Sequence, residues 1–134
     1  MFAAERLQSL LYVSAVTSLL DTFTVGLNTY PMLMYGTVMP DEWGPQASTI
    51  NYYQADSISG DLEYGAYTYY VNCRAATESE SRLIAIAVFG QLNRLVKSNL
   101  SAVCSLLKPI PPADETDNFN TIVKVDIRTR GTVN

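Results

Sequence analysis

The chain has 134 residues, of which 48% are hydrophobic, and this composition suits a single globular domain with its own core. Charged residues make up only 16%, so part of the surface is expected to be covered by partners, and the net charge of −4 disfavours a dedicated nucleic-acid-binding domain, because an acidic chain repels phosphate backbones. The absence of histidine excludes Cys-His and Ser-His nucleophile systems and removes the commonest metal ligand.

The first segment, residues 3–20, is predicted to be helical because its leucines recur at near-helical spacing. Residues 21–29 are expected to form a bend or a broken helix end, marked by Gly26 and Asn28. The early charged pair Glu5–Arg6 argues against a signal peptide, and no run reaches the roughly 20 apolar residues of a membrane span. No membrane partner is therefore predicted.

The middle of the chain is typical of strands separated by turns. Residues 30–40, YPMLMYGTVMP, suit a short extended run between two prolines, and residues 41–46, DEWGPQ, suit a turn. Residues 48–57, STINYYQADS, are rich in β-branched and aromatic side chains and predict a strand. A turn at 59–65 then leads to the strand 66–75, AYTYYVNCRA.

Period-two alternation in residues 66–75 predicts one face toward the core and one outward. The predicted inner residues are Tyr67, Tyr69, Val71 and Cys73. Thr77 and Glu80 then form a capping-box pattern that begins a helix. The apolar residues between Leu83 and Val96 make a surface wider than one stripe, which predicts a second cover by the amino-terminal helix or by a neighbouring subunit.

The end of the chain predicts two more strands, at 101–107 and 121–131, joined by a long polar loop at 108–120 of the kind that is often functional. The last strand alternates apolar and polar residues, so one face is expected to be buried and the other wet. The order of elements predicts one α+β domain over 1–134: a two-layer sandwich with a mainly antiparallel sheet covered on one face by two helices.

Few residues suggest chemistry. The acidic residues cluster in turns, where solvated loop charges are the expected role, and the cluster in DETDN lacks the glycine and distal glutamate of a calcium loop. No phosphate loop or dinucleotide motif is present, so the sequence predicts no enzyme, no cofactor and no metal site. Cys73 and Cys104 are expected to be buried reduced thiols, although an oxidising compartment would permit a disulfide between them.

Two other features allow more than one interpretation. Trp43, in a tight turn, is either a plug against its own core or an anchor at a protein interface. Lys124, Arg128 and Arg130 form a basic line on one strand face, which is either solvated or turned toward a neighbour or DNA. The strand tyrosines are expected to pack across the sheet rather than to stack on bases.

In order, the segments TYPMLMYG, GPQASTINYYQ, YTYYVNCRAATESESRLIAIAVFGQL and FNTIVKVDIRTRG resemble the tail terminator (tail completion) proteins of long-tailed bacteriophages. The resemblance covers most of the chain. It implies a structural virion protein, assembled in the host cytoplasm, that forms a homohexameric ring at the head-proximal end of the tail. The ring would cap the completed tail tube and join it to the head connector. The implied partners are other copies of the chain, the tail tube protein and the connector or neck proteins, with DNA only passing through the lumen.

Within this interpretation, exposure alone suggests contacts with other subunits or with the tube. The candidate contact residues are Trp43, Pro45, Asp114, Glu115, Phe119, Arg128 and Arg130. Two alternatives stay open. One is another head–tail connector or neck protein, such as a head completion or adaptor protein. The other is a cytosolic α+β domain that binds a small ligand.

Overall fold

The computed structural model describes residues 3–37, 40, 43, 44, 46–58, 64–97, 100–106 and 118–130. Three helices lie within these ranges: α1 (Ala3–Leu11), α2 (Ser14–Thr17) and α3 (Glu78–Leu92). The strands described are β1 (Thr22–Val25), β2 (Asn28–Pro31), β3 (Leu33–Tyr35), β4 (Thr49–Ile58), β5 (Tyr64–Ala75), β6 (Leu95–Lys97), β7 (Leu100–Leu106) and β8 (Phe119–Arg130).

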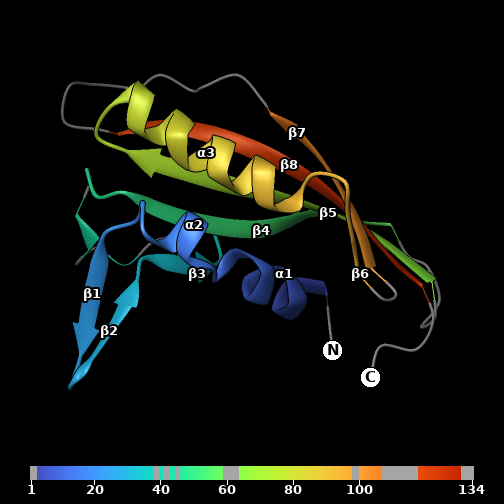
Figure 1. Cartoon of the computed structure of the whole chain (residues 1–134), viewed down its shortest axis with the longest axis horizontal. Coiled ribbons are helices and arrows are strands. Elements are labelled where there is room, and N and C mark those ends of the chain that lie inside the picture. The colour runs from blue at the N-terminus through green and yellow to red at the C-terminus, as the bar shows by residue number, and fades with distance from the viewer. Residues whose placement is uncertain are drawn as a thin grey trace.

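Six of these strands form one sheet in the order β3-β4-β5-β8-β7-β6, and the helices lie on one of its faces (Figure 1). All neighbouring pairs are antiparallel except β3 and β4, which run parallel. The predicted α+β sandwich with a mainly antiparallel sheet is therefore confirmed. The sheet is mixed at the β3 edge, and three helices rather than two belong to the described ranges.

The core lies between the sheet and the helices. Its fully buried members include Leu7 and Leu11 of α1, Val16 of α2, Val88 of α3 and Val125 of β8. The predicted alternation in β5 is confirmed, because Tyr69, Val71 and Cys73 are buried while Tyr67 is half-buried and packs against the same core. Cys73 and Cys104 are both buried and free, as predicted. The Tyr52 hydroxyl donates a hydrogen bond of 2.7 Å to Gln8, which connects the sheet to α1.

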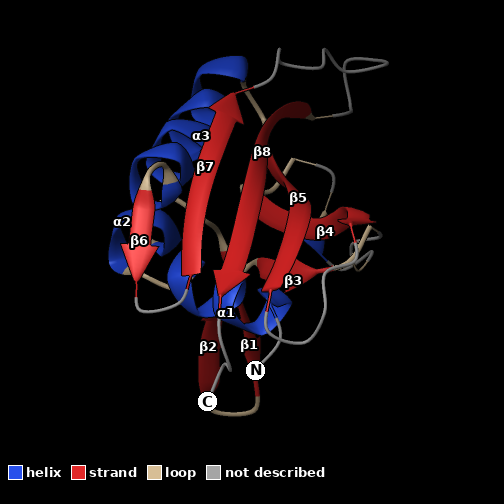
Figure 2. Cartoon of the chain, turned by 90° about the vertical axis from the view of Figure 1, so that its right-hand side faces the viewer, coloured by secondary structure: helices blue, strands red, loops and turns tan. Residues whose placement is uncertain are grey.

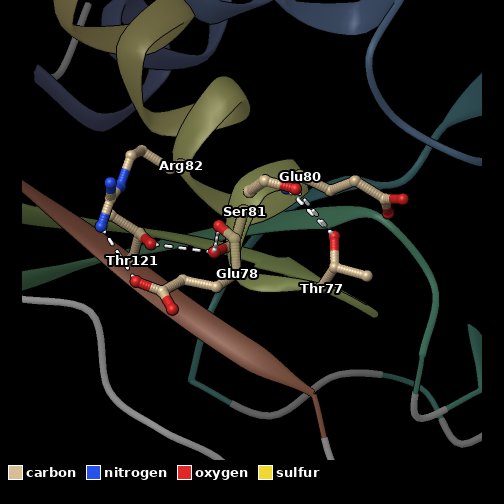
Figure 3. A network of polar contacts seen from close by, with 7 residues as sticks. Thr77, Glu78, Glu80, Ser81, Arg82 and Thr121 are labelled. Atoms are coloured by element: carbon tan, nitrogen blue, oxygen red, sulfur yellow. Dashed lines mark hydrogen bonds and ion pairs between the residues drawn. The ribbon is translucent and has the colours of Figure 1, made fainter.

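Helix α3 begins as the capping box predicts. Thr77 has extended backbone angles, and its hydroxyl accepts a hydrogen bond of 3.2 Å from the Glu80 backbone N–H (Figure 3). Glu78 pairs with Arg82 one turn later at 2.9 Å. The acidic first turn also suits the positive end of the helix dipole. Residues close in sequence thus fix where this helix starts.

The end of α3 differs from the prediction. Leu95 and Val96 were expected on the helix, but the helix ends at Leu92 and both residues belong to β6. Asn93 leaves the helical conformation with ψ of 128°, and Arg94 has a left-handed φ of 60° that reverses the chain. The Asn93 side-chain oxygen accepts a hydrogen bond of 3.0 Å from the Cys104 N–H, which fixes this turn against β7.

The amino-terminal segment also differs. The predicted helix over 3–20 is divided, because Val13 adopts an extended conformation between α1 and α2. Residues 21–29 were expected to form a bend, but they belong to a two-stranded antiparallel hairpin of β1 and β2. Gly26 has a left-handed φ of 62° at its turn, so the glycine marks a hairpin turn rather than a helix end. This hairpin stands away from the main sheet (Figure 1).

Candidate interaction surfaces

The titratable groups in the core are held in their neutral forms. Burial raises the pKa of the Cys73 thiol, and burial together with nearby Asp126 raises that of Cys104 to about 12. Burial likewise raises the pKa of the Tyr52 and Tyr69 phenols to about 12. A thiol or phenol that acts as a nucleophile or general base needs a pKa lowered toward neutrality. The pKa values of these four groups are raised instead.

The described residues contain no group of three His, Cys, Asp or Glu side chains placed to hold a metal ion. Among the helices in the described ranges, none is long and apolar enough to cross a lipid bilayer. The features that stand out are exposed apolar side chains on three separate parts of the fold.

The first of these is the tip of the β1–β2 hairpin. Leu27 is completely exposed in the turn, and Val25 beside it is also exposed. Asp21 fixes the base of the hairpin: its N–H donates to the Ser48 carbonyl, its carboxylate accepts the Ser48 N–H, and its carbonyl accepts the Met32 N–H, each at 2.8 Å. A projecting hairpin with a firmly held base and an apolar tip is suited to contact another molecule.

Trp43 packs against this hairpin. The residue is only 9% exposed, and the centre of its ring lies 5.3 Å from the centre of the Phe23 ring in β1. Phe23 in turn contacts the Tyr30 ring across the hairpin at 5.7 Å. In this structure Trp43 is packed against its own fold. Its predicted role at an interface stays a prediction, and any such role would act through the hairpin that it supports.

The second surface is the face of the sheet opposite the helices, which we call the open sheet face (Figure 2). Lys124, Asp126 and Arg128 of β8 point to this side, because the residues between them are buried beneath α3. Asp126 accepts a hydrogen bond of 2.7 Å from the Thr68 hydroxyl. Val103 of β7 pairs with Asp126 in register and is 56% exposed. A hollow of about 470 Å³ lies here, lined by Ala66, Tyr67, Thr68, Ser101, Val103, Asp126, Ile127 and Arg128.

At the other end of the same face, polar side chains are buried. The Asn51 side chain donates to the Gly36 carbonyl at 3.0 Å, and Arg74 donates to the Asn118 side chain at 2.9 Å. Four buried polar atoms on adjacent register positions have no hydrogen-bond partner among the described residues: Thr49 Oγ1, Asn51 Oδ1, Asn72 Oδ1 and Arg74 Nε.

The third surface is the outside of α3, which we call the outer α3 face and define by Glu80, Leu83 and Ile86. Leu83 is 56% and Ile86 53% exposed, and Leu19 lies close to Leu83. A groove of about 130 Å³ separates Leu19 and Ser48 from Glu80, Leu83 and Ile84. The amino-terminal helices α1 and α2 contact α3, which is one of the two alternatives that the sequence left open for its second cover. They leave the outer α3 face uncovered.

The residues predicted to make contacts do not gather at one place. Pro45, Asp114 and Glu115 lie outside the described residues. Phe119 begins β8 opposite Ala75 and is half-buried, whereas Arg128 is exposed on the open sheet face, roughly 30 Å farther along the strand. The Arg130 backbone pairs with Tyr64, and its side chain lies outside the described part.

Sequence reasoning missed the hairpin tip and the outer α3 face. Residues 22–25 and 28–31, TFTV and NTYP, flank a short Gly-Leu turn and alternate in the way that predicts a hairpin. That signal is readable from the sequence. The exposure of Leu83 and Ile86 is not, because α3 has apolar residues on nearly all sides and only packing decides which of them are covered.

A comparison with protein-family models and one with curated proteins both find no match. Among solved structures, a chain described as "Virion of native gene transfer agent (GTA) particle" is similar to this one, with 18% sequence identity and a TM-score of 0.43 over 73% of this chain and 78% of that chain. At this level of similarity, neither a shared fold nor a shared function follows from the match.

Proposed function

We propose that this chain is a structural protein of a phage-type virion, a tail terminator whose copies form a ring on the completed tail tube. The ring would lie at the head-proximal end of the tail and join the tube to the head connector, with DNA passing through its lumen. The order of sequence segments that resembles tail terminator proteins is the basis for the role itself.

The arrangement of exposed apolar residues is the structural observation that supports the proposal. Leu27 on the hairpin, Leu83 and Ile86 on α3, and Val103 on the open sheet face lie on three different parts of the molecule. A ring subunit needs two complementary surfaces for its neighbours and further surfaces for the structures above and below. An enzyme or small-ligand-binding domain needs one enclosed pocket with convergent polar groups instead.

The test is to assemble tails in cells that lack this chain and to measure tail length by electron microscopy. If the chain is a terminator, tails that assemble without it should have uncontrolled length. Adding the purified chain to a tail-assembly reaction should restore the normal length. Tails of normal length that fail to join heads would instead identify a neck adaptor. Normal, fully joined particles would reject both roles.

A direct test of assembly is negative-stain imaging and sedimentation of the purified chain, alone and with tails. Annular particles are expected in at least one of these conditions. A chain that stays monomeric in both would reject the ring.

A further inference from the structure

We propose that copies of this chain join head to tail, with the outer α3 face of one copy seated on the open sheet face of the next. This inference rests on the proposed ring and identifies the two surfaces that would close it. The occupant of each surface is therefore a second copy of the same chain.

The two faces match in apolar character. Leu83 and Ile86 project from α3, with Leu19 close by, and more than half of the surface of both α3 residues is exposed. The hollow on the open sheet face measures about 470 Å³ and has Val103 in its lining. A water occupies roughly 30 Å³ in the liquid, so the hollow has room for more than one apolar side chain. Burying such side chains against Val103 would remove apolar surface from water on both copies.

The two faces also match in charge. The net charge of the whole chain is −4. On the open sheet face, however, Lys124 and Arg128 carry positive charge beside the negative Asp126. One Asp126 oxygen already accepts a hydrogen bond from the Thr68 hydroxyl. Glu80 is exposed at the start of the outer α3 face. Within the described residues, the recorded ion pair is Glu78 with Arg82, which leaves Glu80, Lys124 and Arg128 available for contacts between copies.

The spacing of these groups is compatible with one contact. Arg128 is itself part of the lining of the hollow. Glu80 and Leu83 are three residues apart on α3, which is about 4.5 Å along the helix axis. A single α3 helix laid along β8 can therefore bring the Glu80 carboxylate close to Arg128 while Leu83 enters the hollow.

The position of the two faces determines the type of assembly. They lie on opposite sides of a two-layer sandwich, since α3 covers one face of the sheet and the open sheet face is the other (Figures 1 and 2). A contact between two different surfaces is heterologous, and repeated copies close into a ring when the rotation between them permits. The β1–β2 hairpin stays free for other components.

The decisive experiment uses two variants that each lose one face, Leu83→Asp and Val103→Asp, with Val25→Asp as the matched control. Val25 is also an exposed apolar strand residue, but it belongs to the separate β1–β2 hairpin and to neither face. Circular dichroism and thermal melting confirm that each variant is folded. Sedimentation, alone and with tails, should show that either face variant self-associates at least about tenfold more weakly than wild type, because it buries an unpaired charge at the contact. The control should assemble as wild type does.

Mixing the two face variants gives the sharpest outcome. Leu83→Asp keeps its open sheet face and Val103→Asp keeps its outer α3 face, so the mixture should form one-to-one dimers and stop there. A contact between identical surfaces would give no such rescue. A charge exchange is an independent check: Glu80→Arg and Arg128→Glu should each weaken assembly about threefold, and the double variant should restore it.

The possible failures are distinguishable. If wild type forms rings and both face variants also form them, the copies join through other surfaces; the inference is wrong and the ring proposal stands. If the mixture yields no dimers while each variant is folded and defective, the contact is not head to tail. If wild type stays monomeric alone and with tails, both the ring and this inference are rejected. If wild type binds another virion protein through these faces instead of itself, the inference is overturned as well.

Discussion

The hydroxyl groups of Ser81 and Thr121 lie 2.9 Å apart inside the core and join the first turn of α3 to β8 (Figure 3). The single hydroxyl proton of Ser81 is used in a 2.9 Å hydrogen bond to the Glu78 carbonyl, so Thr121 is the donor in the pair. Both side chains are buried. This pair is one of the contacts that hold α3 on the sheet in the orientation that leaves Leu83 and Ile86 facing outward.

The first prediction concerns this pair. Ser81→Ala should destabilise the protein by roughly 1–3 kcal/mol, because the buried Thr121 hydroxyl loses its acceptor. The double variant with Thr121→Val should lose less than the sum of the two single variants, because it removes both polar groups. Urea unfolding of the four proteins measures the coupling. Strictly additive losses would show that the two hydroxyl groups do not interact.

A second prediction concerns the start of α3. Thr77→Ala should cost about 1 kcal/mol of stability, because the Glu80 N–H loses its capping acceptor. Thr77→Ser keeps a hydroxyl at the same position and should cost much less. Thermal unfolding compares the two, and equal losses would mean that the methyl group rather than the cap matters.

A third prediction concerns Trp43. Trp43→Ala should weaken binding to tails or connectors, because it removes the ring that packs on Phe23 at the base of the β1–β2 hairpin, and this hairpin lies on neither joining face. Trp43→Phe keeps an aromatic ring and should bind more nearly as wild type does. Co-sedimentation with tails measures this binding, and unchanged binding by a folded Trp43→Ala variant would reject this role.

A fourth prediction separates the hairpin tip from the ring contact. Leu27→Asp should change the free energy of unfolding by less than about 0.5 kcal/mol, because the side chain is fully exposed. It should leave self-association intact and weaken binding to tails or connectors, since the tip lies on neither of the two joining faces. Co-sedimentation with tails measures this binding. A Leu27→Asp variant that loses its rings would place the hairpin between subunits instead.

A fifth prediction concerns alkaline pH. The folded-state pKa values of Cys104, Tyr52 and Tyr69 are raised to about 12, from ordinary values of 9.0 for the thiol and 10.0 for the phenols. The folded protein therefore holds these protons more tightly than the unfolded chain does, and stability is lost as pH rises above the unfolded values toward about 12. Urea midpoints should fall steadily above pH 9 and stay unaffected by these groups below it. A flat profile up to pH 11 would contradict the raised pKa values.

Features that depend on neighbouring residues could be predicted from the amino-acid sequence alone. Thr77 and Glu80 locate the start of α3 because a cap forms within one turn of chain, and alternation around Val71 identifies the buried face of β5 because strand side chains have a period of two. Arg128 could be placed on an exposed face for the same reason. The α+β class follows from the order of such elements.

Long-range packing settles which surfaces stay uncovered. The division of the first helix at Val13, the parallel pairing of β3 with β4 and the exposure of Leu83 on an all-round apolar helix all depend on packing between residues far apart in the chain. Local propensity is similar for several arrangements, and the burial of shared apolar surface selects among them. The outer α3 face is what that selection left exposed, so no local pattern could have located it.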